Sequence, residues 1–313
     1  MFAIKYFVWR YVMKNPAQNG IGLAILAAAL YAINSPFSKL LLDYVPSTLM
    51  AGFLYVGAGM GMLLIASIRK ATGKKPDESR LTKAELPFTI AMIVLDIAAP
   101  IFLLIGLSRT SAANASLLNN FEIVATALIA LMVFREHISP RLWLGILFVT
   151  LSCALLSFED LSSLHFSSGS LFVLLAACCW GLENNCTRKI SSKDPLQIVL
   201  LKGIFSGTGS IVIGFVIGER ITHFWSIPLV LLLGFVAYGL SIYFYVYAQR
   251  ELGAARTSAY YAVAPFIGTF LSLLIFRSIP GAIYFIALFF MLIGAWLSSQ
   301  DIPLSEVFRR KNR

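Results

Sequence analysis

The amino-acid sequence predicts an all-α membrane protein of ten transmembrane helices, arranged as two inverted repeats of five helices with both termini in the cytoplasm. Three observations support this fold class. The composition is typical of a chain dissolved in lipid, since 58% of its residues are hydrophobic and 13% are charged, whereas about a quarter of residues are charged in soluble domains. The chain also contains ten long apolar stretches, and its second half repeats features of the first.

The ten apolar stretches are the expected helices. A transmembrane helix needs about 20 mainly apolar residues. The stretches that qualify are 19–42, 47–68, 84–107, 111–134, 140–157, 168–187, 196–217, 226–248, 255–276 and 281–299. Most connections between them are short, so helices adjacent in sequence are expected to pack as antiparallel neighbours.

The distribution of basic residues predicts the orientation. Of the 25 Lys and Arg residues, 20 fall in the N-terminal segment, in the even-numbered connections or in the C-terminal tail. The odd-numbered connections contain Arg109, Arg220 and Arg277. Loops rich in Lys and Arg remain in the cytoplasm, which places both termini there. The formal net charge of +10 is thus explained by topology, and no nucleic-acid partner is expected.

Both ends of the chain are predicted to lie on the cytoplasmic side. Residues 1–18 form an apolar, aromatic segment interrupted by Lys5, Arg10 and Lys14, without the cleavage pattern of a signal peptide. Such a segment is typical of a helix lying in the membrane interface. Residues 300–313 end in a run of basic residues and are expected to form a cytoplasmic tail.

The internal repeat is visible as matched positions. A shift of 149 positions aligns Tyr31 with Trp180 and Pro46 with Pro195, and a shift of 142 positions aligns the fourth span of each half. Chance similarity between apolar segments is the alternative, because Ala, Leu and Gly recur everywhere. The matched proline and basic positions argue for a true repeat.

The repeat predicts two structural units, residues 19–157 and residues 168–299. Each unit has five helices, an odd number, so the two units must enter the membrane with opposite orientations. Inverted repeats of this kind are a design of secondary transporters, in which the halves exchange conformations around one central site.

Short motifs at matched places resemble a known family. The segments Ala-Ala-Leu-Tyr-Ala-Ile-Asn (28–34) and Ala-Cys-Cys-Trp-Gly-Leu-Glu (177–183) are similar to the opening of each repeat in EamA-type members of the drug/metabolite transporter superfamily. The segments 111–116 and 253–258 resemble the openings of that family's fourth helices. The resemblance covers residues 20–300 and implies an alternating-access carrier, often an exporter of amino acids or other metabolites.

The sequence also departs from the family pattern in two places. Tyr31-Ala32 stands where the first repeat would carry Trp-Gly. Glu136 resembles the acid that ends the fourth helix of the first repeat, whereas Ser278 occupies the matching position of the second repeat. A role for that acid is therefore not expected in the second half.

Four ionisable residues fall inside the expected spans, namely Asp96, Glu122, Glu183 and Lys202. A charged side chain at the centre of a bilayer costs about 2.5–3.5 kcal/mol on insertion scales, so each should face a cavity or a partner. Asp96 and Glu122 are expected near the midplane. Glu183 and Lys202 lie on consecutive helices at a similar depth nearer the cytoplasm, and are expected to form an ion pair.

Further polar and aromatic residues recur at helical spacing on four related spans. The candidate substrate pathway combines them with the four ionisable residues: Tyr31, Asn34, Asp96, Asn119, Glu122, Trp180, Glu183, Asn184, Lys202, Tyr238 and Tyr261. The alternative for the asparagines is structural, since polar side chains commonly hydrogen-bond between packed membrane helices. Three more tyrosines, at positions 243, 245 and 247, are interpreted as anchors at the membrane interface.

Taken as function, these features predict a secondary transporter of a small metabolite, an amino-acid-like solute or drug, exported across a bacterial inner membrane. The expected partners are a small-molecule substrate and the lipid bilayer, with Glu122 or Glu183 as candidates for proton coupling. No catalytic constellation, metal-ligand spacing or phosphate-binding loop is present in the sequence, so neither enzymatic activity nor a cofactor is expected. A sugar-nucleotide or phosphometabolite carrier is the alternative, although it would need several basic residues in the cavity. A membrane-embedded enzyme or lipid scaffold is the alternative of another class.

Overall fold

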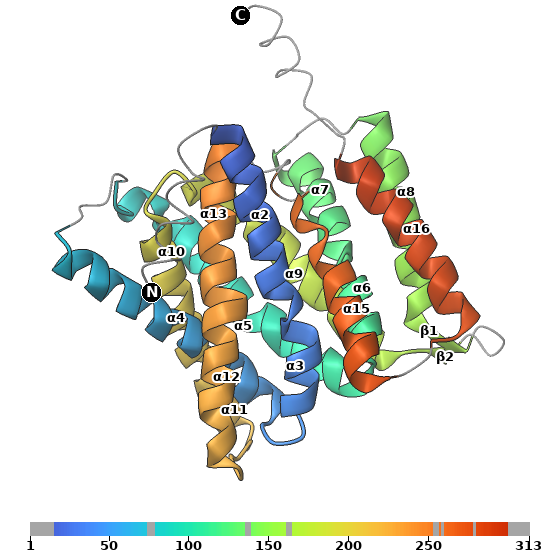
Figure 1. Ribbon diagram of the computed structural model, residues 1–313, viewed down its shortest axis with the longest axis horizontal. Helices are drawn as coiled ribbons and strands as arrows, with labels where there is room; N and C mark the ends of the chain where they lie inside the picture. The colour runs from blue at the N-terminus through green and yellow to red at the C-terminus, as the bar shows by residue number, and fades with distance from the viewer. Residues whose placement is uncertain are drawn as a thin grey trace, which may run out of the picture.

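The computed structural model describes residues 16–73, 79–134, 139–160, 165–252, 257, 260–277 and 280–299. Within these ranges the protein is a bundle of helices that run broadly along one direction (Figure 1). The expectations for the two ends of the chain fall mostly outside the described residues, which begin at Pro16 and end at Ser299.

The first half contains seven α-helices, a short 3-10 turn and a short strand in its described part. These elements are α2 (Pro16–Ala32), α3 (Asn34–Leu41), α4 (Ser47–Ala71), η1 (Lys83–Glu85), α5 (Leu86–Arg109), α6 (Ala112–Leu118), α7 (Phe121–Phe134), α8 (Pro140–Ser157) and β1 (Phe158–Asp160). The second half follows the same order with different interruptions. Its elements are β2 (His165–Phe166), α9 (Ser168–Ile190), α10 (Pro195–Leu201), η2 (Lys202–Ser206), α11 (Gly207–Val216), η3 (Phe224–Ser226), α12 (Ile227–Gly234), η4 (Phe235–Leu240), α13 (Ser241–Leu252), α15 (Ala264–Phe276) and α16 (Ala282–Ser299).

The described helices lie within or close to the expected spans, and the described part of the ninth span contains α15. Five described helical runs are long and apolar enough to cross a membrane: Gly20–Leu41, Ser47–Ala71, Lys83–Arg109, Pro195–Val216 and Phe224–Arg250. Three shorter helices, Pro140–Leu156, Ala264–Phe276 and Ala282–Leu297, are also apolar. The protein is therefore an integral, multi-pass membrane protein whose described residues are almost entirely helical.

Three of the expected spans are broken rather than continuous. The first span turns at Ile33 between α2 and α3, and the fourth turns at Asn119 and Asn120 between α6 and α7. In the ninth span, residues 262–263 form a turn before α15, which carries Pro265 in its first turn. Proline cannot donate the backbone hydrogen bond that a continuing helix requires. The breaks of the fourth and ninth spans fall at nearly matching positions of the repeat.

Two further spans change their helical pitch in the middle. The segments η2 and η4 are π-helical, with α-helix on both sides of each. The sequence patterns predicted plain α-helices over 196–217 and 226–248, so this is a correction. The π-helix is rare and often occurs at functional sites, and both π segments carry a residue of the candidate pathway, Lys202 in η2 and Tyr238 in η4.

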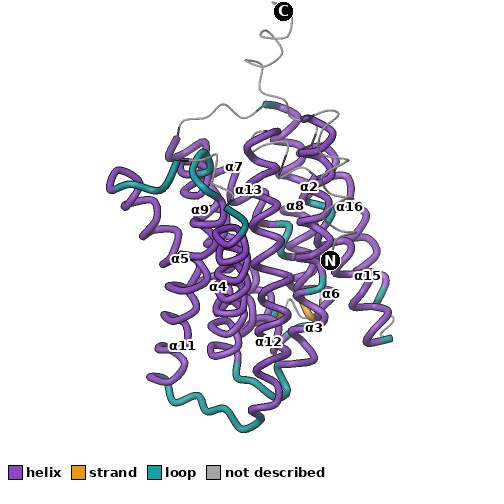
Figure 2. The backbone as a smooth tube through the Cα atoms, turned by 60° about the vertical axis from the view of Figure 1, so that its left-hand side comes forward, coloured by secondary structure: helices purple, strands orange, loops and turns teal. Residues whose placement is uncertain are grey.

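The packing of the helices follows the repeat. α5 packs extensively on α9, and α2 packs on α13, which is the corresponding pair when the two halves are exchanged. α8 and α16, the last helix of each half, lie side by side at one edge of the bundle (Figure 1). Figure 2 shows from another side that α4 lies beside α5 and α11, with which it is in contact. Each of the two contacts joins one half to the other, and exchanging the halves converts one contact into the other, as a two-repeat architecture requires.

A short β-hairpin joins the two halves. β1 and β2 pair antiparallel, with Phe158 opposite Phe166. The hairpin has three residues in one strand and two in the other, so the fold class remains all-α as predicted. Two strands of two or three residues make no hydrophobic face of their own, which explains why hydropathy patterns did not reveal them.

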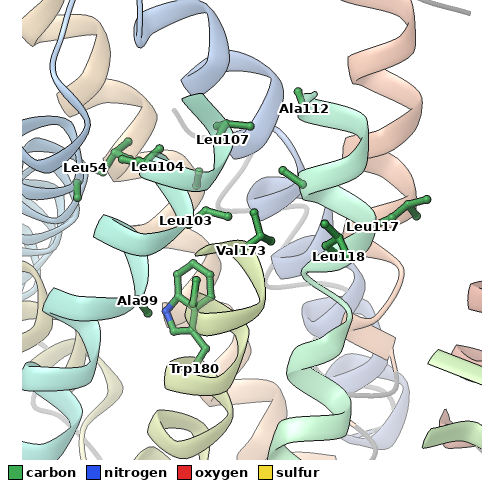
Figure 3. Close-up of a cluster of buried hydrophobic side chains, with 14 of the residues drawn as sticks. Leu54, Ala99, Leu103, Leu104, Leu107, Ala112, Leu117, Leu118, Val173 and Trp180 are labelled. Carbon is green, nitrogen blue, oxygen red and sulfur yellow. The ribbon is translucent and has the colours of Figure 1, made fainter. Parts of the chain in front are cut away.

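The apolar core lies where the central helices meet. Leu103, Leu104 and Leu107 of α5 are buried, as are Val173 and Trp180 of α9 (Figure 3). Gly106 brings these two helices close, since a Cβ placed there would lie 2.7 Å from a Val173 methyl group. Small residues allow membrane helices to approach in this way. The close α5–α9 contact positions Asp96 and Glu183, which lie farther along the same two helices.

Candidate functional site

A cavity lies at the centre of the bundle, and both halves of the chain contribute to its wall. It contains about 560 Å³ of space between atoms, part of it open to the outside. Its wall consists of Tyr31, Tyr55, Asp96, Glu122, Trp180, Glu183, Asn184, Thr187, Lys202, Tyr238, Ile242, Tyr245, Val246 and Tyr261. Nine of the eleven candidate pathway residues are among them.

The remaining two candidates, Asn34 and Asn119, lie behind the wall. Asn34 donates from Nδ2 to the Tyr238 hydroxyl at 3.4 Å, and its own Oδ1 accepts from Ser38. Asn119 donates from Nδ2 to the Tyr31 hydroxyl at 3.3 Å. Both asparagines sit beside helix breaks and hold lining rings in position, so the geometry favours the structural interpretation for these two residues.

The densest electrostatic feature is a buried cluster around Lys202. Its ammonium nitrogen lies 2.5 Å from Glu183 Oε1 and 3.1 Å from Asp96 Oδ2. Asp96, Glu183 and Lys202 are each at most 4% exposed. The ion pair expected between Glu183 and Lys202 is confirmed, and Asp96 is a third member that the sequence did not suggest.

Neutral donors complete this cluster. The Tyr55 hydroxyl donates to Asp96 Oδ1 at 2.7 Å, and the Thr187 hydroxyl donates to Glu183 Oε1. Breaking one partner of a buried pair is strongly unfavourable, because it leaves an uncompensated charge. The three charges and two hydroxyls therefore form a connected unit that ties α4, α5, α9 and η2 together.

The position of Lys202 depends on how tightly η2 approaches α4. A Cβ on Gly203 would lie 2.3 Å from the Gly59 backbone nitrogen, so only glycine fits there without a shift of the backbone. The close approach and the π-helical pitch bring Lys202 to the same level as Asp96. Sequence spacing had placed Asp96 nearer the midplane than Lys202, and the ion pair corrects that estimate.

Glu122 occupies a different part of the wall, in the first turn of α7. Its Oε1 accepts a hydrogen bond of 2.5 Å from Asn184 Nδ2. Among the described residues, no Lys, Arg or His forms an ion pair with Glu122. A carboxylate near the start of a helix is favoured by the helix dipole, but inside a membrane it still lacks a full counter-charge.

Aromatic rings make up much of the wall. Tyr31 is central to them, with ring centroids 6.3 Å from Trp180, 5.9 Å from Tyr238 and 5.8 Å from Tyr261. Tyr245 packs edge-on to Tyr261 at 4.8 Å. The aromatic residues come from both halves, and together they form an amphipathic surface around the cavity.

The sequence pattern did not indicate several of the wall residues. Tyr55 was not considered, although a tyrosine in the middle of an apolar span needs a partner for its hydroxyl group. Tyr245 was interpreted as an interface anchor, which is wrong, because it is 8% exposed and lines the cavity. The wall also contains Ile242 and Val246, which could not be predicted because an apolar residue in an apolar span does not stand out from its neighbours.

The fold is shared with a solved structure. A chain described as "Crystal structure of protein" superposes with a TM-score of 0.66, covering 90% of this chain and 95% of that one, at 16% sequence identity. At this level of identity the likeness concerns the fold alone.

Two curated relatives are named as transporters. One is an "Uncharacterized transporter" of Methanothermobacter thermautotrophicus, 24% identical over 81% of this chain and 78% of its own length. Another is "Uncharacterized transporter YyaM" of Bacillus subtilis, 21% identical over 80% of this chain and 83% of its own length.

The profile of the EamA-like transporter family matches this chain twice, over residues 18–158 and 167–300. The two matches divide the chain at the β-hairpin, where the internal repeat also divides it. They confirm the resemblance carried by the motifs of each half. The chain belongs to the EamA-like transporter family.

Proposed function

We propose that this protein is a secondary transporter that moves a small organic solute out of a bacterial cell across the inner membrane by alternating access. One observation carries the proposal: a polar, aromatic cavity at the centre of the bundle receives side chains from both repeats. In transporters built from inverted repeats, the substrate site lies at the repeat interface and is often formed by discontinuous helices. The broken helices α2/α3 and α6/α7 contribute Tyr31 and Glu122 to this wall.

The proposed topology has ten spans, with both termini in the cytoplasm. Residues 19–157 and 168–299 are the two units, 1–18 is an interfacial segment and 300–313 is a cytoplasmic tail. The correspondence between the α5–α9 and α2–α13 contacts supports two units of equivalent structure. The charge distribution supports their opposite orientation.

Two contacts between α4 and the α10–α11 region are suited to act as gates. At one end of α4, the Arg69 guanidinium lies 2.6 Å from Asp194. At the other end, Glu219 accepts from the backbone nitrogens of Thr48 and Leu49 at 3.2 and 2.8 Å. In the proposed topology the first contact is cytoplasmic and the second is external. Opening one while keeping the other would expose the cavity to one side at a time.

The cavity disfavours the phosphometabolite alternative. Binding of a phosphate group calls for basic side chains, and Lys202 is the one Lys or Arg among the lining residues that the structure describes. Its ammonium group already contacts two carboxylates. A phosphate group in this cavity would therefore face more negative than positive charge.

The test of alternating access is cysteine labelling inside the cavity. Ile242→Cys, in a variant whose four native cysteines are replaced, should react with a membrane-impermeant maleimide from either side of sealed vesicles. Met132→Cys is the control, because Met132 is 70% exposed on the outside of the bundle and would face lipid. Reaction of Ile242→Cys from one side under all conditions would contradict transport by alternating access.

A further inference from the structure

The charges lining the cavity do not balance. Asp96, Glu122 and Glu183 face one ammonium group, that of Lys202, so the described wall has a formal charge of −2 when all four are ionised. Lys202 is in contact with Asp96 and Glu183 but forms no ion pair with Glu122. A carboxylate in a membrane interior is costly unless a counter-charge or a proton neutralises it.

We propose that the transported solute is an organic cation with an ammonium group that pairs with Glu122. This inference rests on the proposed function and names its substrate class. The ammonium would supply the counter-charge that the described part of the chain does not provide. The Asn184 amide, 2.5 Å from Oε1, orients the carboxylate while leaving its second oxygen available to the ligand.

The aromatic wall supports the same class of ligand by a separate argument. Rings attract a cation placed over their faces, by about 0.5–2 kcal/mol depending on desolvation. Tyr31, Trp180 and Tyr261 are close to one another and line the cavity that also contains Glu122. A carboxylate bordered by several rings is a combination that suits an ammonium group and its apolar substituents.

The same geometry disfavours a free carboxylate on the ligand. An amino acid has an ammonium and a carboxylate, and the latter would need a positive group in the wall. Lys202 is committed to Asp96 and Glu183, and no Arg is found among the described lining residues. A decarboxylated amine should therefore bind more tightly than the amino acid from which it derives.

The test uses four soluble compounds of similar shape and different charge. These are 2-phenylethylamine (cationic), 2-phenylethanol (neutral), phenylalanine (zwitterionic) and phenylacetate (anionic), titrated calorimetrically into the purified full-length protein in lipid nanodiscs at neutral pH. We expect 2-phenylethylamine to bind at least about tenfold more tightly than each of the others, equivalent to about 1.4 kcal/mol. Equal or tighter binding of any other compound, or no binding of the amine, overturns the inference.

Variants identify the site. Glu122→Gln should remove the preference for the amine, whereas Asp43→Asn, at an exposed position, should leave it unchanged. Trp180→Phe should retain most of the affinity that Trp180→Leu loses. Thermal unfolding of each variant establishes that it is folded. An intact preference in folded Glu122→Gln overturns the assignment, while labelling of Ile242→Cys from both sides would still support transport of some other solute.

Discussion

At the residue scale, the candidate site consists of two electrostatic units with different surroundings. Lys202 has two carboxylate partners, Asp96 and Glu183. The Tyr55 and Thr187 hydroxyls donate further hydrogen bonds to these two carboxylates. Glu122 has an amide partner and an open cavity before it. The first unit is suited to holding helices together, and the second to meeting a ligand or a proton.

The three-membered cluster makes a specific prediction for stability. Lys202→Met leaves two buried carboxylates without a counter-charge and should lower the free energy of unfolding by about 3–5 kcal/mol. Glu183→Gln should cost less, because Lys202 keeps Asp96 as its partner at 3.1 Å. The double variant Lys202→Met/Glu183→Gln leaves Asp96 as the one charged member of the cluster. Its loss of unfolding free energy should lie between those of the two single variants. Chemical unfolding in detergent measures all three, and equal losses for both single variants would contradict the shared cluster.

Glu122 predicts a pH dependence. Protonation removes the charge that a cationic ligand needs, so ligand affinity should decrease as the pH falls, and Glu122→Gln should bind weakly with a flat profile. The titratable groups of neighbouring elements are those of Tyr31, Asp96, Glu183, Lys202 and Tyr261. Binding of 2-phenylethylamine from mildly acidic to mildly basic pH measures this. A Gln variant that keeps the wild-type profile would assign the proton to Asp96 or Glu183.

At the element scale, the sequence predicted the helices better than their interruptions. Hydrophobicity identifies where a chain can lie in lipid, and all the described helices fall in or near the expected stretches. The turn at Asn119 and Asn120 and the π segments depend on contacts made after folding, such as the Asn119–Tyr31 hydrogen bond. The break before α15 is different, because Pro265 in its first turn is a local signal that the sequence itself carries.

The π segment η2 makes a prediction about packing. Gly203→Ala introduces a Cβ 2.3 Å from the Gly59 nitrogen, so α4 and η2 must separate, at a cost of about 1–3 kcal/mol. Gly22→Ala in α2 is the matched control, since nothing lies within 4 Å of its added Cβ and alanine favours a helix over glycine. The temperature of thermal unfolding in detergent should decrease for Gly203→Ala and should not decrease for Gly22→Ala. Equal stability of both would mean that α4 and η2 can separate freely.

At the scale of the whole molecule, four of the residues that line the cavity could be predicted, because charges in lipid are rare and must be accommodated. Asp96, Glu122, Glu183 and Lys202 were each identified by that rule and all line one cavity. Their division into a cluster and a separate acid could not be predicted, because it depends on the rotation and tilt of four different elements. The position of Tyr245 in the cavity wall could not be predicted either, because the sequence around a tyrosine near the end of a span is the same whether its ring faces the membrane interface or a cavity.

The proposed topology predicts the side from which each connection can be labelled. Cysteines placed at Lys75 and Arg310 should react from the cytoplasm, and one placed at Asp160 should react from outside, because five spans separate Asp160 from the N-terminus. Each is introduced into the cysteine-free variant and labelled in intact cells and in inverted vesicles. Reaction of positions 75 and 160 from the same side would rule out the inverted orientation of the two units.

The two gate contacts make opposite predictions, which allows the alternating motion itself to be tested. Arg69→Gln removes the Asp194 ion pair at the cytoplasmic end of α4, and Glu219→Ala removes the acceptors at its external end. If both contacts stabilise closed ends of one cavity, Arg69→Gln should accelerate labelling of Ile242→Cys from the cytoplasm and slow it from outside. Glu219→Ala should do the reverse, and Lys70→Gln, at an exposed neighbouring position, should change neither rate.

A partly exposed ion pair contributes about 0.2–1 kcal/mol, so the expected change in the ratio of inward to outward labelling is roughly 1.4- to fivefold. That size is measurable because the ratio is taken within one variant and does not depend on how much protein is present. An increase of labelling from both sides in either variant would indicate loosening of the whole bundle. If the labelling ratio changed in the same direction in both variants, the two contacts would not be controlling the same equilibrium between inward-open and outward-open states. Opposite changes are expected when the two ends of α4 report on a single transition.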